Sequence, residues 1–212
     1  MPRRKTIFLE GEYYHVFNRS AFKQPILTKK NDLNFFHQLV QYYLQEKPPI
    51  KFSYYRANPD RYKIDTKRLA TIISYCYMPN HFHFTLRQES TKGIQKFMQK
   101  ILNSFSHYYK LKNNLKGPLF ESTFKSVYIE SNEQLLHLSR YHHLNPVTAY
   151  LVEQPEDYEY SSYRQYMEKN YSLIDPSIVL NQFRSKQEYI KFVINRKDYQ
   201  RDFDKIKHLI LQ

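Results

Sequence analysis

Two apolar stretches separated by a short turn limit the possible folds of this chain more than any other feature. Residues 69–77 are mostly apolar, Met78-Pro79-Asn80 has the composition of a turn, and residues 81–87 alternate between apolar and polar side chains. A mostly apolar run is typical of a strand buried on both faces. We therefore predict two neighbouring strands, 69–77 and 81–87, at the centre of a sheet.

The remaining segments predict a mixed α and β structure. Residues 12–18 and 124–129 have strand composition, and apolar residues recur at helical spacing after Asn31, which could cap a helix that Pro48-Pro49 ends, and again over 91–112. Ser131 and Gln134 stand where a capping box would begin a helix that runs to about Asn145. Residues 50–67 are interpreted as a turn between two short strands or as a hairpin insertion.

Length and pattern indicate one main domain. A chain of 212 residues can bury one good core. Beyond Val152 the sequence becomes polar, rich in tyrosine and helical in pattern, including a helix over 188–197. We predict a main domain over residues 1–152 and a C-terminal helical extension over residues 153–212.

The charge points to a polyanionic partner. The 33 Lys and Arg residues outnumber the 20 Asp and Glu residues, a formal charge of +13 that favours nucleic acid over a surface kept basic only for solubility. The single cysteine, Cys76, excludes an intramolecular disulfide and a cysteine-based zinc site. No stretch has the composition of a signal peptide or a membrane span, so we expect a cytoplasmic protein with no membrane partner.

A candidate metal site combines the second central strand with the helix that follows Ser131. Residues two apart on a strand share a face, so His81 and His83 can meet one ion while Phe82 points into the core. Alone, this pair could equally be two half-buried histidines with ordinary hydrogen bonds. Tyr141 and Asn145 are four residues apart on one helix face and can bring two oxygens to the same ion. Two nitrogen ligands, one oxygen ligand and open positions suit Mg²⁺ or Mn²⁺ acting on a phosphate.

The sequence resembles the family of single-tyrosine HUH transposases, in particular the REP-associated tyrosine transposases. The matching stretches occur in the family's order over about residues 12 to 166. They are Tyr14-His15-Val16-Phe17-Asn18-Arg19, Met78-Pro79-Asn80-His81-Phe82-His83, Gly117-Pro118-Leu119-Phe120, Tyr141-His142-His143-Leu144-Asn145-Pro146-Val147 and Tyr158-Glu159-Tyr160-Ser161-Ser162-Tyr163.

The resemblance implies a ferredoxin-like or RRM-like α/β sandwich with an antiparallel sheet, and residues 1–152 as its catalytic domain. It implies a divalent metal held by His81 and His83, with Asn145 as third ligand, and Tyr141 as the nucleophile that forms a 5′-phosphotyrosine link. It further implies single-stranded DNA with a hairpin as the partner, bound by a monomer or a homodimer. Because Pro146 disfavours the α conformation at Asn145, we expect the helix to unwind there.

Several residues near these motifs keep two interpretations. Arg19 is equally suited to binding phosphate and to simple solvation. Thr123 stands where the family often has arginine, and Lys125 could compensate in DNA binding. We interpret His15 as a packed strand histidine rather than a group supporting a metal ligand, and His142 and His143 as surface residues rather than DNA contacts.

A non-enzymatic, domesticated nucleic-acid-binding module is the main alternative function, because binding requires neither a nucleophile nor a metal. A tyrosine relaxase or replication initiator is disfavoured by the short chain.

Overall fold

The predicted strands pair into one antiparallel sheet of four strands in the order β2-β3-β1-β4. Its members are β1 (Tyr13–Arg19), β2 (Ala70–Met78), β3 (His81–Gln88) and β4 (Lys125–Tyr128). This description comes from a computed structural model that describes residues 6–168 and 171–195. The two apolar stretches are adjacent, as predicted, but only β3 lies at the centre, beside β1. The prediction that residues 69–77 are also central is wrong, because β2 is an edge strand of the sheet.

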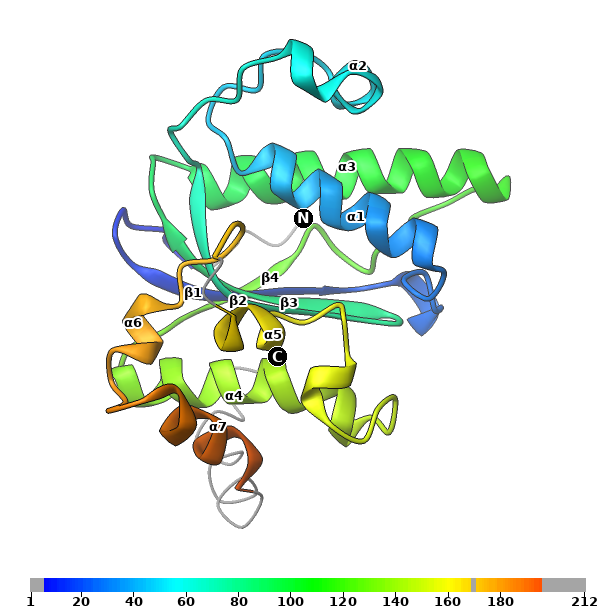
Figure 1. Ribbon diagram of the computed structural model, residues 1–212. Coiled ribbons are helices and arrows are strands. Elements are labelled where there is room, and N and C mark those ends of the chain that lie inside the picture. The colour runs from blue at the N-terminus through cyan, green and yellow to red at the C-terminus, as the bar shows by residue number, and fades with distance from the viewer. Residues whose placement is uncertain (1–5, 169–170, 196–212) are drawn as a thin grey trace.

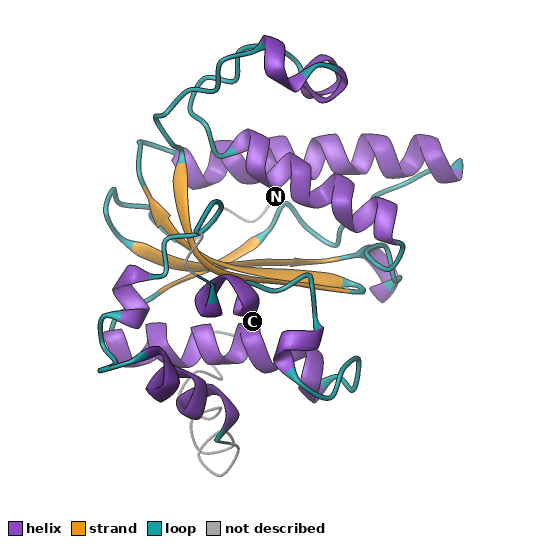
Figure 2. Ribbon diagram, viewed as in Figure 1, coloured by secondary structure: helices purple, strands orange, loops and turns teal. Residues whose placement is uncertain are grey.

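Helices cover both faces of the sheet, so the molecule has three layers (Figures 1 and 2). On one side α1 packs against α3, and on the other α4 packs against β2 and β3. The helical segments are η1 (Ala21–Lys23), α1 (Lys30–Tyr43), α2 (Phe52–Ala57), η2 (Pro59–Arg61), α3 (Gly93–Asn113), α4 (Asn132–Thr148), η3 (Pro155–Asp157), α5 (Tyr163–Met167), α6 (Ser177–Leu180) and α7 (Lys186–Ile194).

The chain order and the strand order together define the fold class. The core runs β1-α1-β2-β3-α3-β4 with β3 inserted between β1 and β2, which is the ferredoxin-like split β-α-β arrangement. The predicted α+β sandwich is therefore confirmed. None of the helices in the described part of the chain combines the length and apolarity needed to cross a bilayer.

Aromatic side chains fill the layer between the sheet and the α1–α3 pair. Phe36 of α1 lies 5.3 Å from Phe82 and 5.1 Å from Phe105, measured between ring centroids. Phe97 of α3 lies 6.0 Å from Phe84. All five rings are fully buried, and aromatic pairs at these separations add to the free energy gained by burial. The even-numbered residues of β3 thus pack against α1 and α3, and its odd-numbered residues point to the opposite face of the sheet.

Gly93 allows α3 to start close to β2. A Cβ atom at this position would lie 1.9 Å from the carbonyl oxygen of Leu69, which no side chain can tolerate. The glycine thus sets the close approach between the start of α3 and the start of β2.

Three further expectations for local structure are wrong. Asn31 does not cap the first helix but lies inside α1, whose N-cap is Lys29. Residues 50–67 form α2 and η2 instead of strands, because the short helix buries Phe52 against Phe35 and Tyr42 (ring centroids 5.6 and 5.3 Å apart), and such packing overrides strand propensity. The helix with Asn145 also does not unwind there. It continues through Pro146 to Thr148, since a proline removes only one helical hydrogen bond and later carbonyls still find donors.

Residues after 152 pack on the sheet and on α4. Ser161 and Ile174 form isolated bridges with Cys76 and Ile72 along the outer edge of β2, and α7 contacts α4. An otherwise exposed strand edge is covered in this way. The predicted helix over 188–197 corresponds to α7, with its last residues outside the described part. The division into 1–152 and 153–212 stays a prediction.

Candidate active site around His83

The odd-numbered residues of β3 carry the candidate site. His81 and His83 lie on the sheet face that α4 covers, with their ring centroids 4.9 Å apart. Phe82 points to the opposite face and packs on Phe36. The period-two alternation of a strand therefore places the two imidazoles together, as the sequence predicts.

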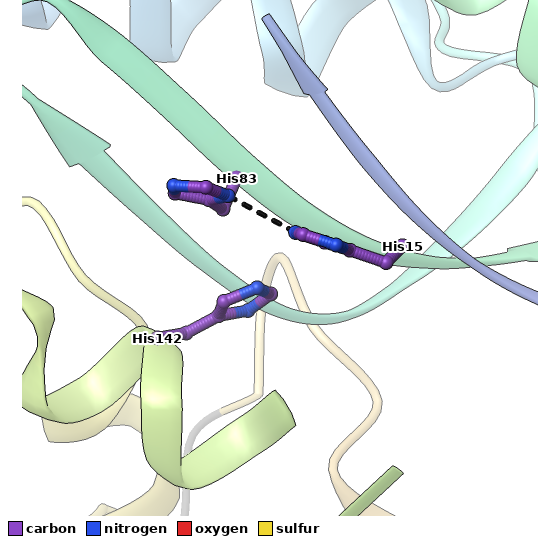
Figure 3. Close-up of side chains that lie close together, drawn as sticks. All are labelled: His15, His83 and His142. Atoms are coloured by element: carbon purple, nitrogen blue, oxygen red, sulfur yellow. Dashed lines mark hydrogen bonds between the residues drawn. The ribbon is translucent and has the colours of Figure 1, made fainter. Parts of the chain in front are cut away.

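His83 is the centre of this group. Its side chain is 4% exposed, and its Nδ1 lies 3.0 Å from Nε2 of His15, with which it shares a hydrogen bond (Figure 3). The two rings are stacked, with an interplanar angle of 15°. The other nitrogen of His83, Nε2, is buried and has no hydrogen-bond partner among the described residues. His15 thus fixes the orientation of His83 and leaves one ring nitrogen available.

His142 reaches the same place from α4. It is fully buried, its Nδ1 lies 2.9 Å from the hydroxyl of Ser74, and its Nε2 has no partner in the described part of the chain. His15, His83 and His142 form a cluster whose ligand atoms lie within 4.8 Å of one another and could hold a metal ion (Figure 3). The interpretation of His142 as a surface residue is wrong, because α4 is buried on this side and also beneath α7.

His143 is buried as well, which contradicts its interpretation as a surface residue. Its Nε2 lies 2.9 Å from the Ser162 hydroxyl and its Nδ1 lies 2.8 Å from the Tyr189 hydroxyl. Both ring nitrogens are therefore used in joining α4 to the chain beyond residue 152. His143 is therefore a structural residue that connects α4 to Ser162 and Tyr189.

The helix α4 brings Tyr141 to His83. Their ring centroids are 5.3 Å apart with the planes at 83°, so the phenol meets the imidazole edge to face. Tyr141 is 9% exposed. Asn145 lies four residues further along the same helix and is also buried, and its side-chain nitrogen has no hydrogen-bond partner among the described residues. A half-turn of the amide would present oxygen in place of nitrogen.

Both histidines of β3 are neutral at ordinary pH. Burial lowers the pKa of His81 to about 4, with a further contribution from the Arg19 guanidinium. Burial also lowers the pKa of His83 well below its usual value, and the neighbouring histidines and Arg19 act in the same direction. Neutral imidazole is the form that binds metal ions. The pair can therefore accept a cation without first losing protons.

Cationic side chains lie at the edge of the site. Arg19 is the strand partner of His81 in the β1–β3 ladder and is exposed. Lys125 stands opposite Phe17 at the start of the edge strand β4 and is also exposed. Both positions are open to a phosphate backbone, and Arg19 is close enough to lower the pKa of two histidines.

The residues present fit a divalent cation. His81 shares a hydrogen bond of 2.6 Å between its Nδ1 and the side-chain oxygen of Asn80, so its Nε2 is the nitrogen left for a ligand role. The buried Nε2 of His83 is unpartnered among the described residues, and Asn145 supplies a buried amide. Buried polar atoms normally have partners, so an orphaned imidazole nitrogen is an expected feature of a metal site.

Comparison with solved structures adds an independent observation. A REP-associated tyrosine transposase, solved bound to a REP hairpin, matches with a TM-score of 0.55 over 83% of this chain and 90% of that chain. The protein has the fold of that transposase. Sequence identity between the two is 16%, so the likeness concerns the fold. No protein-family model and no curated protein sequence matches the chain.

Proposed function

We propose that the protein is a metal-dependent DNA transposase that cuts and rejoins single-stranded DNA through a covalent link to Tyr141. The observation that carries this proposal is the contact between the Tyr141 ring and His83. His81 lies next to His83, and Nε2 of His83 is buried without a hydrogen-bond partner among the described residues. A phenol and two neighbouring histidines that could bind a metal therefore lie together on one face of the sheet. The fold shared with a transposase and the charge of +13 support the same function.

His81, His83 and Asn145 would hold the ion, either Mg²⁺ or Mn²⁺. When bound, a divalent cation neutralises charge on the phosphate oxygens and lowers the barrier to displacement. His15 keeps the ring of His83 oriented through its hydrogen bond, and Asn80 does the same for His81. The cluster of His15, His83 and His142 is a second way to hold an ion, but the hydrogen bond between Nε2 of His15 and Nδ1 of His83 already uses one nitrogen of each of these two rings.

Tyr141 would supply the nucleophile. Its phenolic oxygen forms a bond to phosphorus, the bond from phosphorus to the 3′ oxygen breaks, the phenol loses its proton and the leaving 3′ oxygen gains one. The products are a 5′-phosphotyrosine and a free 3′ hydroxyl. Since one phosphodiester replaces another, the step needs no nucleotide and can be reversed to rejoin strands. The substrate we propose is single-stranded DNA flanked by a hairpin, bound with the help of Arg19 and Lys125.

A second candidate is a nucleic-acid-binding module without enzyme activity. The low exposure of Tyr141, 9%, favours it, because a nucleophile must reach a phosphorus atom. This function would use the same fold and charge and would not need the orphaned histidine nitrogen.

One experiment separates the two functions. Wild type and Tyr141→Phe are incubated with Mn²⁺ and a labelled pool of hairpins carrying randomised single-stranded flanks, and adducts that survive denaturant are counted. The transposase function predicts an adduct with wild type alone. Binding by both proteins without any adduct, with Mn²⁺ shown to be bound, supports the binding module. An undiminished adduct in Tyr141→Phe assigns the nucleophile to another residue.

A further inference from the structure

An exposed phenylalanine lies in η1, the short turn that follows β1, where its backbone is not helical. We refer to this turn and its flanking residues 20–24 as the loop. Phe22 is 87% exposed and has a φ of 56° and a ψ of 21°, and the next residue, Lys23, has a φ of 55°. Two consecutive left-handed residues without a glycine are costly, most of all for a bulky aromatic residue. Such strain persists only where the surrounding structure imposes it, and it is concentrated at functional positions.

Hydrogen bonds on both sides impose this conformation. The Ser20 hydroxyl donates to the carbonyl of Gln24 at 2.6 Å, and the Lys23 amide donates to the carbonyl of Ser20 at 3.1 Å. The Ala21 amide donates to the carbonyl of Leu119 at 2.9 Å. The backbone of the loop is thus well held, while the ring that it displays has almost no packing.

Asn80 connects this loop to His81. Its side-chain nitrogen donates to the carbonyl of Lys23 at 3.2 Å, and its side-chain oxygen lies 2.6 Å from Nδ1 of His81. Its backbone carbonyl also accepts a hydrogen bond from the amide of Ser20. One residue therefore holds both the loop that displays Phe22 and a proposed metal ligand, His81.

Charge around the ring matches a nucleic acid strand. Arg19 and Lys23, which precede and follow Phe22 in the chain, are both exposed, so they can neutralise a phosphate backbone while a base meets the ring. An aromatic face next to cations is the usual arrangement for binding a single strand, because every base has a π-face.

We propose that Phe22 is a stacking platform for one base of the single-stranded DNA next to the scissile phosphate. The proposal rests on the proposed function and adds the contact that positions the strand against His81. The alternative use of an exposed aromatic ring, contact with a second protein chain, becomes an outcome of the test.

Binding is measured by fluorescence anisotropy in a Tyr141→Phe background, where the strand stays intact. The probe is the strand that the parent protein selects from the randomised hairpin pool. Phe22→Gly is expected to bind roughly fivefold or more weakly, since stacking contributes about 1–3 kcal/mol per base, while Phe22→Trp retains affinity. Tyr54→Ala is the matched control, because Tyr54 is 60% exposed and lies on α2, on the far side of the sheet. It should bind like the parent.

The stability of Phe22→Gly makes the test independent of folding. Glycine accepts a positive φ, so this variant should melt at the same temperature as the parent or higher. Weaker binding by a protein that is equally or more stable cannot come from damage to the fold.

An abasic scan identifies the contact itself. Single bases of the selected strand are removed in turn, and one position should weaken the parent by a factor similar to that of Phe22→Gly. The same abasic position should have no further effect on Phe22→Gly, because the two changes remove one interaction.

The results separate this inference from the proposed reaction. Equal binding of parent and Phe22→Gly to intact and abasic strands, or conversion of a dimer to a monomer by Phe22→Gly, overturns the stacking platform. Neither result affects the adduct formed by wild type. Conversely, a missing adduct overturns the reaction while the abasic scan still reports on Phe22.

Discussion

Buried neutral histidines should make the metal-free protein unstable in mild acid. Burial lowers the pKa of His143 to about 3 and the pKa values of His83 and His142 well below their usual value. An unfolded histidine takes up a proton near pH 6.5. Between about pH 6.5 and the folded pKa values the unfolded chain binds more protons, so stability is full above pH 6.5 and decreases as the pH falls.

The size of this effect follows from the number of groups. From pH 7 to pH 5 each such histidine costs about 2 kcal/mol, and so does His81 with its pKa of about 4, so the four together cost about 8 kcal/mol. This is a large part of the 5–15 kcal/mol of a typical domain.

Urea unfolding at several pH values, with a chelator present, measures the loss of stability and gives the proton uptake from its slope. His143→Gln removes one titrating group and should lower the uptake at pH 5 by about one proton. A stability that is equal at pH 7 and pH 5, or an unchanged uptake in His143→Gln, would refute the reasoning.

Three further results are expected. His15→Phe keeps a ring but loses the hydrogen bond to His83, so Mn²⁺ affinity measured calorimetrically should fall by roughly 10- to 100-fold; equal affinity would show that His15 only packs. Asp32 is buried and accepts hydrogen bonds from Tyr108 and Lys112, so Asp32→Ala should lose about 1–3 kcal/mol in urea unfolding, and an unchanged midpoint would contradict this. Arg19→Gln should reduce the salt dependence of single-strand binding by about 0.7 in the log–log slope; a slope equal to that of wild type would mean that Arg19 contacts no phosphate.

Local periodicity was sufficient for the main strands and helices and for placing His81 and His83 together, whereas the ferredoxin-like arrangement was expected from the family resemblance. The alternation along 81–87 places His81 and His83 on one face regardless of the rest of the chain. The capping residue Ser131 accepts a hydrogen bond from the Gln134 amide at 3.2 Å and begins the helix of Tyr141 where the sequence predicts it. These features depend on neighbours only a few residues away.

The missed parts depend on contacts between distant segments. His15 meets His83 only because β1 pairs with β3 in a register that places His15 opposite Thr85, and His142 joins them only when α4 docks on the sheet. The sequence signal that could have indicated burial of α4 is the scarcity of charge from Leu138 to Val147, where Arg140 is the one Lys, Arg, Asp or Glu residue; this whole run is buried. No pattern in the sequence singles out Phe22, because the feature that draws attention to it is the left-handed conformation of its backbone.

The most direct test of the central claim is to locate the covalent bond. Wild-type protein is incubated with Mn²⁺ and the strand selected from the hairpin pool, the DNA is trimmed with nuclease, and the protein is digested and analysed by mass spectrometry. The account predicts a nucleotide remnant on the peptide that contains Tyr141, attached through a 5′ phosphate, and its absence without metal. A remnant on a different tyrosine, or a cut strand with no nucleotide attached to the protein, would contradict it.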